Sequence, residues 1–350
     1  MGKEKAPKGG LVANEYDLLK AFDTEIFYLT IAGFYPKKTP KYKYLYILAA
    51  IFNFSLEYLQ FIAMATLVYQ NFSDVSKVSE ALLFCMTQFA FLNKLNNFII
   101  NKSNWLLLEE MLENPVFRNV ISDEELIVTL YISGGKRIAK IYRVLCVLVV
   151  VFYALFPFMD NRDETQHKFP LPAWFPFNPN EYYYEVFSAE ILSIAIGAWI
   201  NSNIDILTIM AIILGTAQFE VLKRRIKMIL KPAIDGIPVG EDIVQDRVKK
   251  CIIHYNDLLC YVSQIEKTYS KGIFIQFLSS VIVICLTGFQ ILMISFNSMQ
   301  FVLLIIYFSC MMLQIIMYCW YGHMIVESIL RSSYSYFAVL QRIYSKGQIQ

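Results

Sequence analysis

The stretch Ser332-Ser333-Tyr334-Ser335-Tyr336-Phe337-Ala338-Val339-Leu340-Gln341 lies near the end of the chain, just past its final long apolar run. At 3.6 residues per turn, Ser335, Val339 and Ile343 share one face of a helix. A stripe of small polar and apolar residues flanked by aromatic residues is typical of a helix that packs against neighbours in a membrane. The alternative is a short amphipathic tail on the membrane surface, and the upstream sequence favours the first interpretation.

Apolar residues make up 57% of the 350-residue chain, and charged residues make up only 17%. Soluble domains contain about 45–50% apolar and about 25% charged residues. A soluble fold of this length could not bury so much apolar surface, so the composition predicts a polytopic membrane protein. The net charge of +2 gives no support to nucleic-acid binding, and the sequence has no clustered basic face that would provide it.

Six apolar stretches are long enough to cross a hydrocarbon core of ~30 Å, which takes about 20 residues. They run approximately from Tyr44 to Tyr69, Ala81 to Ile100, Ile141 to Met159, Val186 to Ala217, Ile273 to Phe296 and Gln300 to Trp320. A seventh candidate, from Ile325 to Tyr344, is weaker because it contains Glu327 and Arg331, and central charges oppose insertion. The predicted fold is an all-α, polytopic membrane helix bundle with six clear spans and a shortened seventh.

We predict a single membrane domain over residues 1–350. It begins with a cytosolic segment (1–43), in which a short helix near Asp17 is followed by a break at Gly33 and Pro36. Spans one to four occupy 44–217. A cytosolic helical extension follows at 218–271, where apolar residues recur at helical spacing among charges. Spans five and six occupy 272–322, and a truncated last helix occupies 323–350.

Basic residues alternate between the connections. In chain order, the N-terminal segment and the five connections carry eight, one, five, two, ten and no lysines or arginines. The positive-inside rule therefore places the N-terminus in the cytosol, opposite to the orientation of G-protein-coupled receptors. It also predicts that the glycosylation sequon at Asn71 faces outside and that the sequon at Asn101 faces the cytosol.

The third connection, which this orientation places outside, reads Phe169-Pro170-Leu171-Pro172-Ala173-Trp174-Phe175-Pro176-Phe177-Asn178-Pro179. The prolines forbid a regular helix, and the aromatic residues are unlike those of a solvated linker. We therefore expect a compact lid against the membrane surface.

Several of these stretches resemble insect odorant receptors. Ser-Tyr-Ser-Tyr-Phe at 333–337, followed by aliphatic residues, is similar to the last helix of that family, and Pro-Ala-Trp-Phe-Pro-Phe at 172–177 is similar to the same loop. The segment from Cys251 to Leu259 also resembles the family's cytosolic helix. The resemblance implies a plasma-membrane subunit of an odorant-gated, non-selective cation channel. It further implies a co-receptor subunit as partner, a tetramer whose four last helices line the pore, and small hydrophobic odorants as ligands.

The resemblance breaks before the last helix. Tyr318-Cys319-Trp320-Tyr321-Gly322-His323 resembles the end of the family's sixth span, yet Val326-Glu327-Ser328-Ile329 runs directly into Leu330. Family members have the rest of a cytosolic anchor helix and the start of the pore helix between these points. The comparison implies an internal deletion, which arises through splicing, pseudogenisation or a flawed gene model.

Two sets of residues are candidates for function. The outer halves of spans two to four are aromatic and aliphatic with few donors, which suits small volatile ligands recognised by shape and dispersion. The candidate ligand-binding residues are Phe84, Gln88, Phe152, Phe156, Tyr184, Phe187 and Ile191. By resemblance, Ser335 lies on the pore face, and Val339 and Ile343 narrow the pore as a hydrophobic gate that closes by dewetting. The alternative is that Val339 and Ile343 pack against the fifth and sixth spans.

Ionisable residues inside spans are functional candidates by default. We expect Lys94 to reach the cytosolic interface with its long side chain and Glu190 to reach water at the outer end of its span. Asp205, beside Asn201, Ser202 and Asn203, predicts a polar patch that holds helices together rather than an ion site. For His254 we predict a structural role on a packed helix, because no catalytic partner is placed near it.

Enzyme classes find no support, because the sequence has no phosphate-binding glycine loop, HExxH or GxSxG. No cysteine or histidine spacing indicates a metal site, and no cofactor is implied. The alternatives that stay open are a non-conducting or dominant-negative partner of the co-receptor and a gustatory-type chemoreceptor. A G-protein-coupled receptor is disfavoured by the predicted orientation and by the lack of Asp-Arg-Tyr after the third span.

Overall fold

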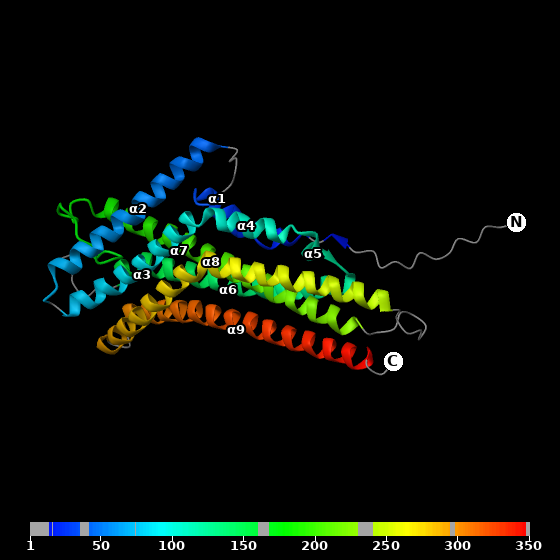
Figure 1. The fold of residues 1–350 in the computed structure, drawn as a ribbon. Coiled ribbons are helices and arrows are strands. Elements are labelled where there is room, and N and C mark those ends of the chain that lie inside the picture. Colours follow the sequence, from blue (N-terminus) through cyan, green and yellow to red (C-terminus); the bar gives the residue numbers. More distant parts are fainter. Residues whose placement is uncertain are drawn as a thin grey trace.

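The computed structural model describes residues 14–15, 17–35, 42–73, 75–159, 168–229, 241–294 and 298–347. Its long helices are α2 (Lys43–Gln70), α3 (Val75–Ile100), α6 (Ser122–Met159), α7 (Tyr183–Met228), α8 (Glu241–Met293) and α9 (Met299–Gly347). The shorter elements are β1 (Asn14–Glu15), a 3-10 helix (Leu18–Ala21), α1 (Asp23–Ile31), α4 (Lys102–Leu112), α5 (Pro115–Arg118) and β2 (Asn119–Val120), which pairs antiparallel with β1. Figure 1 shows the long helices gathered into one elongated bundle.

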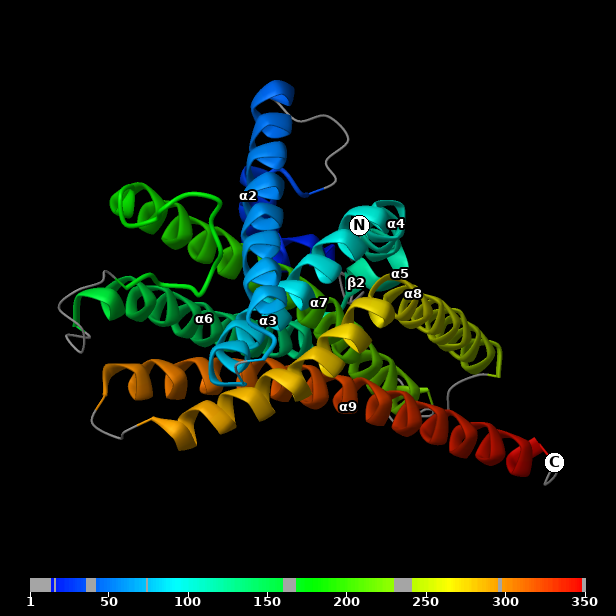
Figure 2. The same cartoon turned by 90° about the vertical axis from the view of Figure 1, so that its left-hand side faces the viewer.

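Helix α7 forms the centre of this bundle. Every residue from Ser202 to Phe219 is buried, and α7 contacts α1, α2, α3, α6, α8 and α9. Ile, Leu, Met and Ala make up more than half of this stretch, which suits a helix that packs on every side, and its polar residues, such as Asp205, are buried as well. Figure 2 shows α7 surrounded by the other long helices.

The predicted polytopic helical membrane bundle is confirmed, but the number of clear spans differs. Among the described residues, five helices are long and apolar enough to cross a bilayer, namely α2, α6, α7, α8 and α9. Helix α3 contains the predicted second span and has 26 residues, which is sufficient length. Its polar residues, such as Gln88, Lys94 and Asn97, lower its hydropathy, and it packs mainly against α8 and α2.

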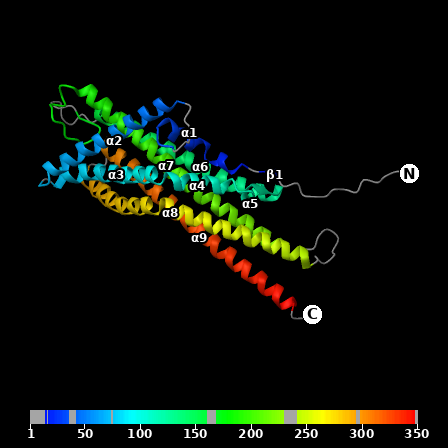
Figure 3. The same cartoon turned by 45° about the horizontal axis from the view of Figure 1, so that its top comes forward.

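The helical extension expected at 218–271 is present as the end of α7 and the first half of α8, with 230–240 outside the described residues. Helix α6 also begins at Ser122, well before the predicted span. Figures 1 and 3 show that these extensions and the end of α9 point toward the same end of the molecule. Arg225 joins the α7 extension to the start of α6 and to β2, because it donates to Glu124 Oε2 at 2.8 Å and to the Asn119 carbonyl at 2.7 Å.

The structure differs from the sequence prediction at the C-terminus. No turn separates Trp320 from Ser332, and the truncated last helix expected at 323–350 is not a separate element, because α9 is one helix from Met299 to Gly347. The stretch between these two points contains no proline, and Glu327 accepts from Arg331 one turn later on the exposed face. Residues expected in a seventh span therefore continue the sixth span beside the α8 extension. There, Ser333 Oγ lies 2.8 Å from Tyr255 Oη, and Tyr336 stacks on Tyr255.

The break predicted at Gly33 is confirmed, whereas Pro36 lies outside the described residues. Gly33 has a φ of +85°, a conformation that favours glycine. A Cβ atom here would lie 2.5 Å from the Ala50 nitrogen of α2, so only glycine allows this close approach. The short helix expected near Asp17 is the 3-10 turn Leu18–Ala21, capped by the Asp17 side chain at Leu19 N.

His254 of α8 has the structural role that the sequence predicts. It is fully buried, its ring packs edge-on against Phe117 at a centroid distance of 5.6 Å, and its Nδ1 lies 3.3 Å from Arg225 Nη1. Burial, together with the Arg225 charge, lowers the pKa of His254 to about 3. The folded protein therefore keeps this imidazole neutral.

We expect the folded protein to lose stability as the pH falls below about 6.5, the ordinary histidine pKa, because the unfolded chain then binds a proton that buried His254 does not bind in the folded state. Between pH 7.5 and 5.5 the loss attributable to His254 is about 1 kcal/mol. The measurement is the melting temperature of detergent-solubilised protein across this range. His254→Gln should flatten the slope, whereas His323→Gln, at an exposed position of α9, should retain it. Equal slopes in the two variants would contradict the assignment.

Candidate ligand-binding site

A cavity, here called the inner chamber, lies between α3, α6, α7 and α9. Its volume is about 130 Å³, and its walls are mainly apolar. The lining residues are Met64, Phe84, Thr87, Gln88, Phe91, Tyr142, Cys146, Val149, Tyr153, Leu171, Ser193, Ile194, Gly197, Ala198, Asn201, Tyr307, Cys310, Met311 and Gln314. Concave sites of this kind, apolar with a few placed polar groups, are typical of small-molecule binding.

A second cavity, the outer chamber, adjoins it beneath the proline-rich connection and has a volume of about 410 Å³. Residues 168–173 of that connection line it, together with residues of α2, α3, α6, α8 and α9. Phe84, Tyr153 and Leu171 line both chambers. These three residues, here called the neck, therefore separate the inner chamber from the outer one.

The proline-rich connection is held in place by its backbone. The Trp174 N–H donates to the Ala63 carbonyl of α2 at 3.1 Å, and the Leu171 N–H donates to Glu190 Oε2 of α7 at 3.3 Å. The connection is therefore fixed over the outer chamber, and its expected position against the membrane surface stays a prediction. Glu190 does not reach water as expected, because only 1% of it is exposed. It instead fixes the loop residue that belongs to the neck.

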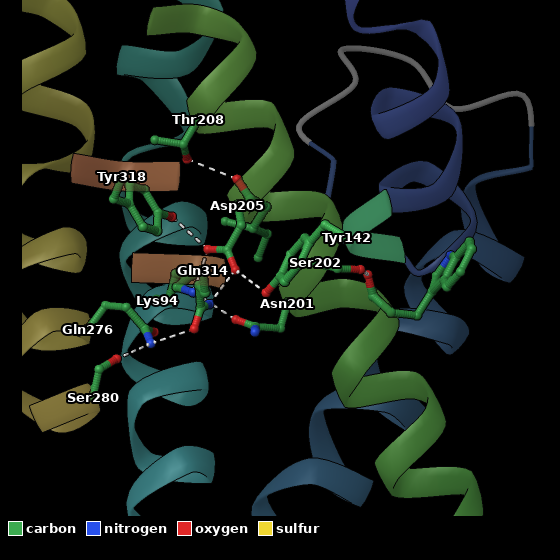
Figure 4. A network of polar contacts seen from close by, with 12 residues as sticks. Lys94, Tyr142, Asn201, Ser202, Asp205, Thr208, Gln276, Ser280, Gln314 and Tyr318 are labelled. Atoms are coloured by element: carbon green, nitrogen blue, oxygen red, sulfur yellow. Dashed lines mark hydrogen bonds and ion pairs between the residues drawn. The ribbon is translucent and has the colours of Figure 1, made fainter. Parts of the chain in front are cut away.

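Asp205 of α7 lies behind the chamber-lining residues Tyr142 and Gln314, and side chains from three helices donate hydrogen bonds or charge to it (Figure 4). Lys94 of α3 lies 2.5 Å from Oδ1, and Tyr318 of α9 donates to the same oxygen at 2.6 Å. Gln314 of α9 donates to Oδ2, as does Tyr142 of α6 at 3.2 Å. The polar patch predicted around Asp205 therefore joins α3, α6, α7 and α9.

The network continues into α8, since Gln276 donates to Gln314 Oε1 at 3.0 Å. Lys94 Nζ also donates to Asn201 Oδ1 at 2.8 Å. The expectation that Lys94 reaches the cytosolic interface is wrong, because its side chain is 6% exposed and paired with Asp205. Burying an ammonium group is costly unless it is paired, and the carboxylate 111 residues away provides that partner.

A second buried carboxyl lies behind the chamber wall. Glu57 of α2 is fully buried, and its Oε2 accepts from Gln88 Nε2 at 2.6 Å. A Cβ atom at Gly197 would lie 2.9 Å from the same oxygen, so glycine lets α7 approach α2 here. Gln88 and Gly197 both line the inner chamber, and Glu57 therefore fixes the amide that the chamber presents.

The structure brings together some of the predicted ligand-binding residues and separates others. Phe84 and Gln88 line the inner chamber. Phe152 and Ile191 are half-buried and pack against the neighbouring apolar cluster. Phe187 packs on Phe158 at a ring-centroid distance of 5.3 Å. Tyr184 is 75% exposed. The side chain of Phe156 lies outside the described residues. Ligand binding by any of these residues stays a prediction.

Several lining residues were not predicted, although two periodic patterns mark them. On α6, Tyr142, Cys146, Val149 and Tyr153 recur at intervals of three or four residues, and all face the inner chamber. On α7, Ser193, Gly197 and Asn201 do the same. Residues at this spacing share one helix face. The sequence identifies such a face but does not say which neighbour it meets.

The predicted pore residues lie in the last turns of α9. Ser335 donates to the Arg331 carbonyl one turn earlier at 2.8 Å. Val339 and Ile343 belong to the helix, and their side chains lie outside the described residues. The hydrophobic gate therefore stays a prediction.

Comparison with known proteins identifies the family. The family model described as 7tm Odorant receptor matches residues 74–339. Odorant receptor Or1 of Anopheles gambiae is 21% identical over 246 residues, which cover 64% of this chain and 58% of that protein. Odorant receptor 82a of Drosophila melanogaster is 24% identical over 301 residues, which cover 80% of this chain and 74% of that protein. The chain thus spans less than two thirds of the length of the Anopheles relative.

A solved structure shares the fold. The olfactory receptor OR5 of Machilis hrabei, determined in complex with eugenol, superposes with a TM-score of 0.77 over 95% of this chain and 89% of that one, at 14% identity. The family and the fold are not those of an enzyme class. Since the family model covers most of the sequence, this chain belongs to the insect odorant receptor family.

Proposed function

We propose that this chain is the odorant-binding subunit of a heteromeric, odorant-gated cation channel in the plasma membrane. Its ligand occupies the inner chamber, and a co-receptor subunit of the same family completes a tetramer. The single observation that carries the proposal is the mainly apolar cavity between α3, α6, α7 and α9, in a chain of this family. The Machilis receptor, which has the same fold, was solved with eugenol bound.

The size of the chamber limits the ligand. An engineered apolar cavity of about 150 Å³ binds benzene, and the inner chamber measures about 130 Å³. A compact volatile molecule of roughly benzene's size therefore fits without rearrangement. Its binding would shift the channel toward the open state only to the extent that the open state binds it better.

We place the N-terminus in the cytosol, on the strength of the alternating basic connections. The α6, α7 and α8 extensions then lie in the cytosol as well. We expect a glycan at Asn71, after the end of α2, and none at Asn101, after the end of α3. Mobility shifts after glycosidase treatment of Asn71→Gln and Asn101→Gln variants measure this. A glycan at Asn101 would contradict the proposed orientation.

The proposed function is tested by recording currents from cells that express this chain with a co-receptor subunit. A panel of compact volatile compounds should evoke cation currents that cells expressing the co-receptor alone do not show. Surface labelling of a tagged chain provides the control for delivery to the plasma membrane. A chain that reaches the surface and binds compact volatiles, yet gives no current with any of them, would contradict the channel proposal.

A second candidate function is favoured by the continuous helix α9. Because residues 320–332 do not turn back toward the membrane, this chain lacks a separate seventh span among its described residues, and we propose as the alternative a non-conducting partner of the co-receptor. Co-purification with the co-receptor without odorant current would favour it. Insertion of a family anchor segment before Leu330 should then restore current. If the insertion does not restore current, the deletion is not the reason that the chain fails to conduct.

A further inference from the structure

Tyr153 contributes the one buried side-chain atom of the described inner-chamber lining that lacks a hydrogen-bond partner. Its hydroxyl group is buried and has no hydrogen-bond partner, and only 3% of the residue is exposed. The side chain belongs to the neck and lines both chambers. An unpaired buried polar group is costly, so a ligand acceptor that reached this hydroxyl would stabilise it.

Most of the other polar side chains of the chamber have partners, whereas the Ser193 hydroxyl has none among the described residues. Thr87 and Tyr307 bond to each other. Tyr142 and Gln314 donate to Asp205, Gln88 donates to Glu57, and Asn201 accepts from Lys94. The protein therefore uses most of the chamber's polar capacity itself, and the Tyr153 O–H remains as a donor.

We propose that the inner chamber selects compact carbonyl compounds, and that Tyr153 is the specificity-determining residue. The ligand class is an aldehyde, ketone or small ester of roughly benzene's size, whose carbonyl oxygen accepts from the Tyr153 hydroxyl at the neck while its hydrocarbon part fills the apolar chamber. A carbonyl oxygen accepts hydrogen bonds and cannot donate them, so it matches a free phenolic donor. The assignment rests on the proposed function only in placing the ligand in the inner chamber.

The test uses two compounds of nearly the same shape, cyclohexanone and methylenecyclohexane, in which a C=CH₂ group replaces the C=O group. Binding is measured by thermal stabilisation of the purified full-length receptor in detergent, and activation by current in cells with the co-receptor. Cyclohexanone should bind roughly five- to thirty-fold more tightly than methylenecyclohexane, which is the ratio that one satisfied buried hydrogen bond gives. Tyr153→Phe should reduce this ratio to about one.

Tyr269→Phe is the matched control. Tyr269 is also buried, and its hydroxyl also lacks a partner, but it contacts Trp105 in the hydrophobic core and lines neither chamber. It should leave the ratio unchanged.

The outcomes separate the two proposals. If both compounds bind equally to the unmodified receptor, if cyclohexanol is preferred to cyclohexanone, or if Tyr153→Phe leaves the ratio unchanged, the carbonyl assignment is overturned while ligand binding in the chamber stands. If the preference and its loss are seen in binding but no current is evoked, the assignment holds and the channel proposal fails. If no compact volatile binds, the inner chamber is not a ligand site and both are overturned.

Discussion

Asp205→Asn is expected to destabilise the folded receptor by about 3–5 kcal/mol, the usual cost of removing one partner from a buried ion pair. Lys94, with a side chain 6% exposed, would be left with only neutral partners. The new amide would also present a donor among the donors of Tyr142, Gln314 and Tyr318, because an asparagine has one acceptor where aspartate has two. The melting temperature in detergent and the fraction of monodisperse protein measure the loss.

A matched charge removal at the surface should have a much smaller effect. Asp246 pairs with Lys250 on α8, where the two side chains are 58% and 73% exposed, so Asp246→Asn should cost less than about 1 kcal/mol. The double variant Lys94→Met with Asp205→Leu should recover only part of the loss, because it removes the unpaired ammonium group but leaves the donors of Tyr142, Gln314 and Tyr318 without an acceptor. Equal melting temperatures for Asp205→Asn and Asp246→Asn would show that the network does not stabilise the bundle.

Much of the fold follows from hydropathy and periodicity. The long apolar runs give α2, α6, α7, α8 and α9, and the apolar spacing among charges in 218–271 gives the extension of α8. These features depend on neighbouring residues in the sequence, so one sequence contains enough information to place them. The continuation of α9 is different, because a charged helix beyond a span is compatible both with a membrane re-entry and with a straight extension.

The site was only partly predictable, because the rotation of each helix about its axis depends on contacts with other helices. Lys94 and Asp205 were both identified as intramembrane ionisable residues, but their pairing depends on how α3 and α7 are rotated about their axes. Phe84 and Gln88 were predicted because the aromatic composition of α3 indicates a lining. Tyr153 and Ser193 were missed because the sequence does not say which face of α6 or α7 meets the cavity.

Ser193→Phe should lower the sensitivity to every compact ligand at least a hundred-fold. Ser193 is 2% exposed and faces the inner chamber from α7. A phenyl ring is the size of the benzene that fills a cavity of about 150 Å³, so it would take up most of the 130 Å³ available. Because the ring fills an existing void, the stability cost should stay within the range of 1–3 kcal/mol typical of overpacking.

Leu192→Phe is the matched control for this substitution. Leu192 is the neighbouring residue on α7, 43% exposed, and does not line either chamber, so the added ring should face away from the chamber and leave sensitivity unchanged. Dose–response curves for current and ligand-induced thermal stabilisation, each normalised to surface expression, measure both variants. If Ser193→Phe reaches the surface and responds with the sensitivity of the unmodified chain, the ligand does not occupy the inner chamber. Because Ser193 and Leu192 are adjacent on one helix, a difference between the two variants can be attributed to the chamber rather than to a general disturbance of α7.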